Sequence, residues 1–224
     1  MSSTDSLSPV RVMLRPIGSA VPLGFSGLAV ASLVLAGLQL SWMPVTQGTI
    51  VGAIIFATAV PLQAVAAINA FAARDGATGT SMGVQSATWA GTAIVLMLSA
   101  PGTTSDAFGL MLLAAGGLLL LSALGSGMGK VVVGLVVATV GARFVVSGIY
   151  ELTASTGVER AAGIVGLVVT GLAAYTALAL EMQDAKGRPV LPMLRRARGR
   201  EAVEGVLREQ VDAVATEPGV RQEL

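Results

Sequence analysis

The chain contains no cysteine and no histidine, and it has few charged or aromatic residues. The absence of cysteine excludes a disulfide framework, a thiol nucleophile and a zinc site built from thiolates. The absence of histidine excludes Ser-His and Cys-His catalytic pairs, imidazole metal ligands and the usual proton shuttle near neutral pH. Only 12% of the 224 residues are charged, which is about half the share of a typical soluble domain. The composition therefore excludes an ordinary cytosolic enzyme and favours an integral membrane protein.

The sequence instead has long apolar runs, since 54% of its residues are hydrophobic and 28 are glycine. A helix needs roughly 20 mostly apolar residues to span a bilayer, and six stretches separated by short breaks reach this length. Because a backbone in lipid must satisfy its own hydrogen bonds, and the runs are too long for barrel strands, each is expected to be a helix. The sequence thus predicts an all-α, polytopic membrane protein whose six transmembrane helices cover residues 20–42, 48–73, 81–100, 107–127, 130–152 and 160–182.

Basic residues are distributed unevenly between the two ends of these helices. With six spans both termini lie on one side of the membrane, and that side carries ten basic residues near the spans, whereas the other carries only Arg160. Basic residues concentrate in cytoplasmic segments, so we expect both termini in the cytoplasm and the protein in the plasma or inner membrane. The ten residues are Arg11, Arg15, Arg74, Lys130, Lys186, Arg188, Arg195, Arg196, Arg198 and Arg200.

Three segments are expected along the chain: a cytoplasmic N-terminal segment (1–18), a six-helix transmembrane domain (19–182) and a cytoplasmic tail (183–224). The N-terminal segment has no apolar run, which argues against a cleaved signal peptide. The tail contains a basic run, LRRARGR, followed by an amphipathic helical pattern over residues 201–215. Two interpretations of the basic run remain open, namely contact with anionic headgroups and a solvated determinant of topology.

Arg143 is the only charged residue expected near the middle of a span, 13 residues after Lys130 and nine before Leu152. Charged groups inside a helical bundle are costly and tend to mark a pathway. A guanidinium that faces a pore would attract a carboxylate and hold it through paired hydrogen bonds. Alternatively, backbone carbonyls or polar neighbours on adjacent helices hold Arg143 for structural reasons.

Several neutral polar residues also fall inside the expected spans. Each either forms a hydrogen bond between helices or helps to wet a narrow lumen. The same choice applies to Pro22, which either begins the first helix or loosens a turn whose carbonyls face a solute. Glu151, Glu159 and Glu181 lie at span ends, where exposure is more common than proton relay. The neutral candidates for a pathway are Gln63, Gln85, Ser86 and Tyr175.

The sequence contains no motif that indicates catalysis, a metal site or a cofactor. It has no Walker A lysine and no pair of metal-binding histidines, and its glycine-rich residues 125–129 join two expected membrane helices instead of a strand and a helix. The net charge of +1 gives no reason to expect nucleic acid as a partner. We therefore expect no enzyme, no metal and no cofactor, with the lipid bilayer as the principal partner.

Two stretches resemble a known family of membrane proteins. Residues 19–25 (SAVPLGF) resemble the NPAPLGL signature of the acetate uptake transporter family, of the succinate–acetate permease type. Residues 175–192 (YTALALEMQDAKGRPVLP) resemble the end of that family's last helix and the G-R-x-V-L-P stretch that follows it. The resemblance covers residues 19–192, with Ser19 in place of the family's leading asparagine and with Pro22, Leu23 and Gly24 retained. It implies that these four residues lie on the substrate pathway.

The resemblance implies six-helix protomers that assemble as hexamers, each protomer with a narrow pore for acetate and related small carboxylates. It also implies a hydrophobic constriction at Leu28, Ala87 and Val140, where Ala87 stands in place of a family tyrosine. The function expected from the residues and the resemblance together is a channel or proton-linked carrier for small monocarboxylate anions. In the absence of histidine, proton coupling would depend on Glu151, Glu181 or the acid substrate itself.

Two other functions remain open at this stage. One is a membrane scaffold that does not transport and whose tail recruits partners, as the basic run and the 201–215 pattern would allow. The other is a transporter of a different small solute such as ammonium, which Ala87 at the expected constriction keeps in consideration.

Overall fold

The structure, a computed structural model, describes residues 18–73, 75–126 and 131–196, and most of these residues are helical. These residues form six α-helices and one short 3-10 helix, and they contain no strand. The all-α fold expected from the sequence is therefore confirmed. The helices are α1 (Val21–Gln39), α2 (Gly48–Ala72), α3 (Gly76–Leu98), α4 (Asp106–Ser126), α5 (Val131–Thr153) and α6 (Thr156–Lys186), and the 3-10 helix η1 (Val45–Gln47) precedes α2.

Five of the six helices are long and apolar enough to cross a membrane, namely α1, α2, α4, α5 and α6. Helix α3 is more polar, because threonine, serine and glutamine occupy many of its positions. It begins at Gly76, earlier than the expected residue 81, because Asp75 caps it. The Asp75 carboxylate accepts hydrogen bonds from the backbone N–H of Thr78 at 3.1 Å and from its hydroxyl at 2.8 Å, which satisfies donors that a helix start leaves unpaired.

The turn between α5 and α6 is shorter than the sequence indicates. The expected break covers residues 153–159, but only Ala154 and Ser155 separate the two helices, and Ala154 adopts a positive φ of 51°. Helix α6 extends to Lys186 and ends at Gly187, whose φ of 62° is the left-handed conformation that commonly terminates helices. Glu159 and Arg160 consequently belong to the first turns of α6.

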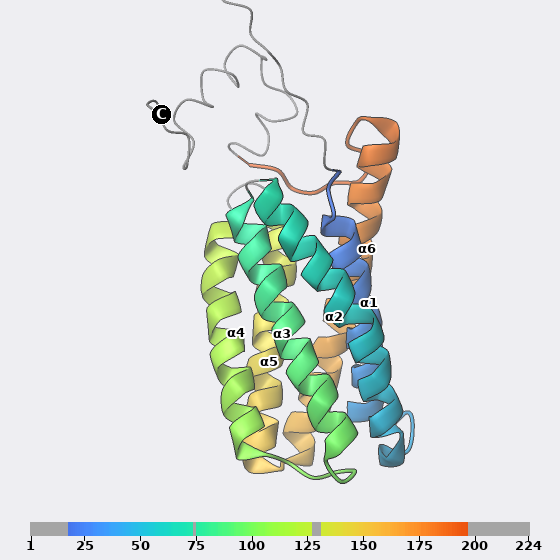
Figure 1. Cartoon of the computed structure of the whole chain (residues 1–224), viewed down its shortest axis with the longest axis vertical. Coiled ribbons are helices and arrows are strands. Elements are labelled where there is room, and N and C mark those ends of the chain that lie inside the picture. Colours follow the sequence, from blue (N-terminus) through green and yellow to red (C-terminus); the bar gives the residue numbers. More distant parts are fainter. Residues whose placement is uncertain (1–17, 74, 127–130, 197–224) are drawn as a thin grey trace, which may run out of the picture.

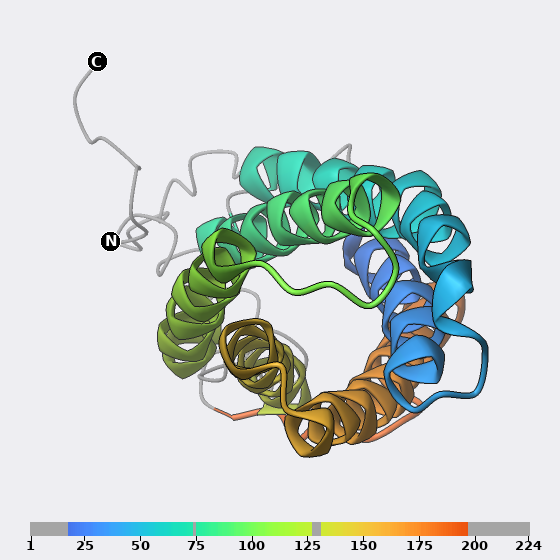
Figure 2. The same cartoon turned by 90° about the horizontal axis from the view of Figure 1, so that it is seen from below.

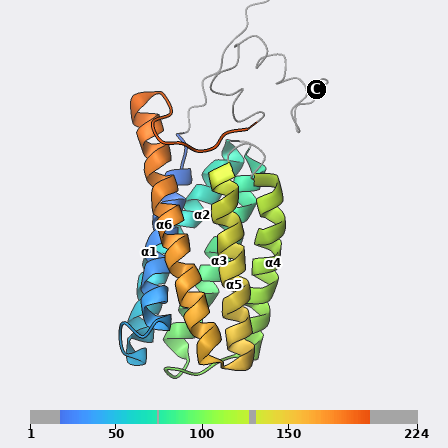
Figure 3. The ribbon, with the colours of Figure 1, turned by 180° about the vertical axis from the view of Figure 1, so that it is seen from behind.

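The six helices form a closed ring. Each helix packs against its neighbours in the chain, and α6 packs against α1 to close the ring, as the view along the bundle shows (Figure 2). The start of α1 and the end of α6 lie together at one end (Figures 1 and 3), which we call the terminal end. The other end, which we call the mouth end, carries residues 40–47, 99–105 and 154–155.

Helices α4 and α5 pack so closely that their backbones touch at glycine. A Cβ atom built on Gly116 would lie 2.7 Å from the carbonyl oxygen of Gly141, and one built on Gly141 would lie 2.9 Å from that of Gly116. Only glycine permits this approach, as in other membrane helix pairs. The adjacent Gly117 has no atom within 4 Å of the corresponding position, so the constraint applies to one face of the helix.

The segment that follows α6 is attached to the terminal end of the bundle. The Tyr175 hydroxyl donates a hydrogen bond to the carbonyl of Pro192 at 2.8 Å, and the N–H of Val131 donates to the carbonyl of Leu194 at 3.3 Å. Arg195 donates to the side-chain oxygen of Gln183. The side chain of Met193 is 97% buried in the apolar core. The first residues of the expected tail thus pack on the bundle.

Some expectations concern residues outside the described ranges. These are the amphipathic pattern over 201–215, residues 127–129 of the glycine-rich stretch, and the basic residues Arg11, Arg15, Arg74, Lys130, Arg198 and Arg200.

We expect Gly141→Ala to destabilise the protein because the added methyl group meets the backbone of α4. Overpacking of this kind costs about 1–3 kcal/mol, which corresponds to a fall of roughly 2–10 °C in the thermal midpoint of a protein of this size. The measurement is thermal unfolding in detergent. Gly117→Ala is the matched control and should leave the midpoint unchanged or raise it, since alanine favours a helix over glycine. Equal midpoints for the two variants would show that the α4–α5 approach is not close.

Candidate functional site

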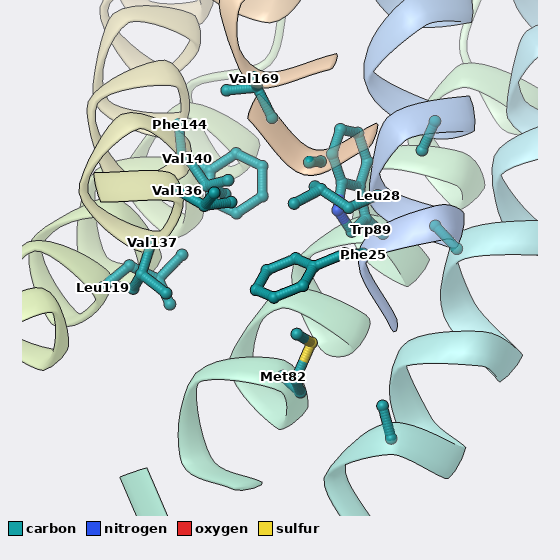
Figure 4. Packing of buried hydrophobic residues seen from close by; sticks show 14 of the residues in the cluster. Phe25, Leu28, Met82, Trp89, Leu119, Val136, Val137, Val140, Phe144 and Val169 are labelled. Atoms are coloured by element: carbon teal, nitrogen blue, oxygen red, sulfur yellow. The ribbon is translucent and has the colours of Figure 1, made fainter. Parts of the chain in front are cut away.

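The centre of the ring is filled by apolar side chains, which we call the apolar plug: Phe25, Leu28, Trp89, Val140 and Phe144. The first four are fully buried and Phe144 is 2% exposed, and Figure 4 shows them converging from α1, α3 and α5. The Trp89 and Phe144 rings meet edge to face with centroids 5.4 Å apart, a favourable aromatic geometry. Two residues of the expected constriction, Leu28 and Val140, therefore lie in the dry centre of the bundle.

The third expected constriction residue, Ala87, lies on the outer surface of α3 and is exposed. It precedes Trp89 by two positions, and two residues correspond to about 200° around a helix. Since Trp89 faces the interior, Ala87 faces away from it. The structure therefore does not place Ala87 at the expected constriction. Trp89 is instead the large side chain that α3 contributes to the centre. The buried face of α3 carries Gln85, Trp89 and Thr92 at helical spacing. This spacing is the sequence signal that could have identified Trp89 as an inward-facing residue.

Arg143 lies on α5 beside the apolar plug and is fully buried. Its Nη1 donates to the carbonyl of Ser32 at 3.3 Å, and its Nη2 donates to the side-chain oxygen of Gln39 at 3.4 Å. Its guanidinium carbon lies 5.3 Å from the centroid of the Trp89 ring, within the range of a cation–π contact. Its Nε has no hydrogen-bond partner. In the described part of the chain, no carboxylate pairs with this cation.

Ser147 lies one turn after Arg143 on the same helix, and its hydroxyl also lacks a partner. This is unusual here, because hydroxyls such as those of Thr88, Thr92 and Thr176 donate to the carbonyl four residues earlier. Such hydrogen bonds satisfy the hydroxyl within its own helix. Ser147 and the Nε of Arg143 are therefore buried polar groups with hydrogen-bonding capacity to spare.

A cavity of about 90 Å³ leads from Arg143 towards the mouth end. This volume is well above the roughly 10–15 Å³ that holds one water, so it can accept a solute of a few heavy atoms. A wider volume of about 680 Å³ adjoins it and shares five of its lining residues. We call the two volumes together the vestibule. The shared residues are Leu38, Val45, Gly102, Tyr150 and Glu159.

Arg143 lies at the inner end of this vestibule. It precedes the last residue of α5, Thr153, by ten positions, which corresponds to about 15 Å along the helix axis. Ser147, Tyr150 and Glu151 line the cavity on successive turns towards the mouth end. The rest of the wall is mainly apolar, with Leu35, Val95, Leu96, Phe108, Leu112 and Phe144 among its residues.

A pair of glutamines lies on the other side of the plug. The side chain of Gln63 on α2 donates to that of Gln85 on α3 at 3.1 Å, and both are fully buried. Gln63 Oε1 and Gln85 Nε2 have no partner. Gln85 precedes Trp89 by one turn, towards the terminal end. The neighbouring Ser86 donates to the carbonyl of Val60 at 2.9 Å, so its hydroxyl joins α3 to α2.

The remaining pathway candidates lie at the terminal end and not beside Arg143. Pro22 is buried in the first turn of α1, which favours the interpretation that it begins the helix. Gly24 permits a close contact, since a Cβ there would lie 2.9 Å from that of Ala66. Ser19 and Leu23 are exposed. Tyr175 uses its hydroxyl to hold the segment after α6.

Comparisons with known proteins agree with this architecture. The model of the GPR1/FUN34/yaaH family matches residues 4–193. A solved structure described as "Structure of the bacterial acetate channel SatP" has a similar fold, with a TM-score of 0.71 and 21% sequence identity. The match covers 79% of this chain and 99% of that one. No curated protein sequence gives a significant match.

We expect the plug to exclude water, and the absence of native cysteine allows a direct test. Val140→Cys should react very slowly with a small hydrophilic thiol reagent because Val140 is fully buried. Adding Trp89→Ala removes the largest side chain of the plug and should raise the labelling rate at least about tenfold. Thr49→Cys at a cavity-lining, exposed position should label at the same rapid rate in both backgrounds, which shows that the reagent itself is equally active on each protein. Rapid labelling of Val140→Cys with Trp89 intact would contradict a dry centre.

Proposed function

The chain belongs to the GPR1/FUN34/yaaH family, and on this premise we propose that it transports acetate and related small monocarboxylates across a membrane. The proposal covers a channel or a proton-linked carrier. It places one route along the axis of each six-helix bundle, from the vestibule past Arg143 and the apolar plug to the Gln63–Gln85 pair. The fold shared with a structure whose description names a bacterial acetate channel supports it.

The observation that carries the proposal is the buried guanidinium without a counter-ion. A charge removed from water is strongly destabilised unless it is paired and hydrogen-bonded. Arg143 is fully buried, yet its two hydrogen bonds are long and go to neutral oxygens. A carboxylate entering from the cavity would supply the missing negative charge and accept charge-assisted hydrogen bonds. The apolar wall beside it suits a short alkyl chain.

The groups along the route divide the passage into three parts. The vestibule admits the solute to Arg143, where the carboxylate loses part of its hydration. The plug closes the route in this conformation, because Leu28, Trp89 and Val140 are fully buried. The free Gln63 Oε1 and Gln85 Nε2 then offer one acceptor and one donor beyond the plug. Movement of Trp89 is the conformational step that such a route requires.

The same cation argues against the alternatives left open by the sequence. Ammonium would be repelled by a guanidinium at the inner end of the cavity, since like charges in a medium of low dielectric constant interact strongly. A scaffold function gives no reason to keep an unpaired charge beside a cavity. No step of the proposed transport is catalytic, and none uses a metal or a cofactor.

The membrane context of the proposal follows from charge and from family resemblance. The described basic residues at and after the end of α6 lie at the terminal end, namely Lys186, Arg188, Arg195 and Arg196, whereas Arg160 lies at the mouth end. By the positive-inside rule the terminal end faces the cytoplasm and the vestibule opens on the other side of the plasma or inner membrane. Assembly of protomers as hexamers remains part of the proposal.

We expect Arg143→Gln to lower saturable uptake of radiolabelled acetate into proteoliposomes by roughly 10–100-fold. This factor corresponds to the loss of a charge-assisted hydrogen bond, which contributes about 1.5–3 kcal/mol. Its thermal midpoint should be unchanged or higher, because the variant removes an uncompensated buried charge. Arg160→Gln is the matched control, because it removes an exposed arginine at the mouth end. This variant should transport acetate at the wild-type rate.

Two results would contradict the proposal. Wild-type protein without saturable flux of acetate, propionate or lactate would contradict the transport function. Normal acetate flux in a folded Arg143→Gln protein would instead assign Arg143 a structural role.

A further inference from the structure

Gln39 is the last residue of α1, and its side chain is buried against Arg143. Its Oε1 accepts the hydrogen bond that Arg143 Nη2 donates at 3.4 Å, and both residues line the cavity of about 90 Å³. A guanidinium carries only donors, so the amide must present its oxygen to Arg143. The orientation of the Gln39 amide is therefore fixed by its partner.

This orientation leaves the nitrogen of the Gln39 amide available. Within the described part of the chain, no hydrogen bond uses Gln39 Nε2. An amide nitrogen carries two hydrogens that it can donate. Next to the guanidinium there is consequently a second, neutral donor for the carboxylate that Arg143 attracts.

Two glycines of α6 hold this pair of side chains in place. A Cβ atom built on Gly163 would lie 3.2 Å from the Cβ of Gln39, and one built on Gly166 would lie 2.9 Å from the guanidinium carbon of Arg143. The backbone of α6 therefore lies directly against both residues. This packing limits their movement and keeps the amide beside the guanidinium.

The two glutamates that line the same cavity lie too far away to take the place of the Gln39 amide. Glu151 follows Arg143 by eight positions on α5, about 12 Å along the helix axis, and accepts a hydrogen bond from a backbone N–H of the loop before α4. Glu159 lies seven positions before the α6 glycine that contacts the guanidinium, and the charge of the adjacent Arg160 acts on it. The side chain beside the guanidinium is thus the neutral amide of Gln39.

The neutrality of this amide matters because glutamine and glutamate have nearly the same shape. A carboxylate at position 39 would accept a charge-assisted hydrogen bond from Arg143 and form a buried ion pair with it. As a group already in place, it would compete with an anion from the cavity at a high effective concentration. A glutamine orients the guanidinium without this competition.

We propose that Gln39 is a positioning and binding residue of this site. Its amide oxygen orients Arg143, its lack of charge leaves the cation unpaired for an anionic solute, and its Nε2 donates to the carboxylate of that solute. The inference rests on the proposed transport function, and it assigns a second residue to the site at which the anion binds.

The first test measures the thermal midpoint of the full-length protein in detergent with increasing sodium acetate, with sodium chloride at equal concentration as the control for ionic strength. The wild-type midpoint should rise with acetate, because a ligand that binds the folded state stabilises it. Gln39→Glu should raise the midpoint without acetate by roughly 2–8 °C, since the new carboxylate pairs with Arg143. It should also abolish the further rise with acetate.

Gln47→Glu is the matched control. It adds the same charge at the mouth end, at a residue that lines neither volume of the vestibule, and its midpoint should respond to acetate as that of the wild type does. A wild-type midpoint that does not respond to acetate overturns the inference. A lower midpoint in Gln39→Glu than in wild type also overturns it.

A double variant tests whether the gain in stability depends on the cation. With Arg143→Gln added, the carboxylate is buried with no cation beside it, which is destabilising. Gln39→Glu should therefore lower the midpoint in the Arg143→Gln background, although it raises the midpoint of the wild type. The same sign in both backgrounds would show that Gln39 acts independently of Arg143 and would overturn the inference.

Uptake of radiolabelled acetate into proteoliposomes completes the test. Gln39→Glu should lower uptake by about tenfold or more. Gln39→Leu removes the acceptor and the donor without adding charge, so it should raise the acetate concentration for half-maximal uptake by about tenfold, with the maximal rate changed less than about twofold. If Gln39→Glu transports acetate normally, transport stands and the inference fails. If no flux is found but the midpoints follow the expected pattern, transport fails and the inference stands.

Discussion

A single buried cation, Arg143, is the constraint on which the interior of this bundle depends. Its guanidinium is fully buried, and the described groups around it are neutral: the Ser32 carbonyl, the Gln39 side chain and the face of Trp89. Such neighbours orient a guanidinium but do not cancel its charge. A buried ion pair would be complete in itself. The arrangement found here is incomplete, and a small anion can complete it.

Room for this side chain comes from small residues on the surrounding helices. A Cβ atom on Gly166 of α6 would lie 2.9 Å from the guanidinium carbon of Arg143 and 3.1 Å from the Cβ of Ala36 on α1. Glycine thus has two distinct uses in this chain. At Gly116 and Gly141 it brings two backbones together, and at Gly166 it makes space for a charged side chain at the junction of three helices. Both uses follow from the absence of a side chain.

The sequence is sufficient to predict the helices but not the partners of the central residue. Apolar runs and their breaks locate all six helices, and the rarity of charge singles out Arg143. Its contacts with Gln39 and Trp89 depend on which face of α1 and α3 turns inward, and α3 has too many polar residues for an apolar stripe to indicate this. The family resemblance, which rests on motifs far from α3, places Ala87 in the interior. An error of two residues in the matching of α3 is enough to explain this, because two residues correspond to a rotation of about 200° around a helix. The hydroxyl of Tyr175 bonds to Pro192, 17 residues later, and no local pattern predicts that the chain folds back there.

The position of the apolar plug next to Arg143 determines what kind of solute the proposed route can carry. Electrostatic attraction is much stronger in a medium of low dielectric constant than in water, so the dry surroundings of Trp89 and Phe144 increase the affinity of the guanidinium for an anion. The same surroundings resist passage of a bare charge, because the polar groups one turn beyond Trp89 are the neutral amides of Gln63 and Gln85. A solute with one charge and a short apolar chain meets both conditions, since it binds at Arg143 and leaves little charge to move through the plug. A second charge would have to cross the plug, whose side chains are apolar, so the plug resists a solute with two charges more strongly than a solute with one.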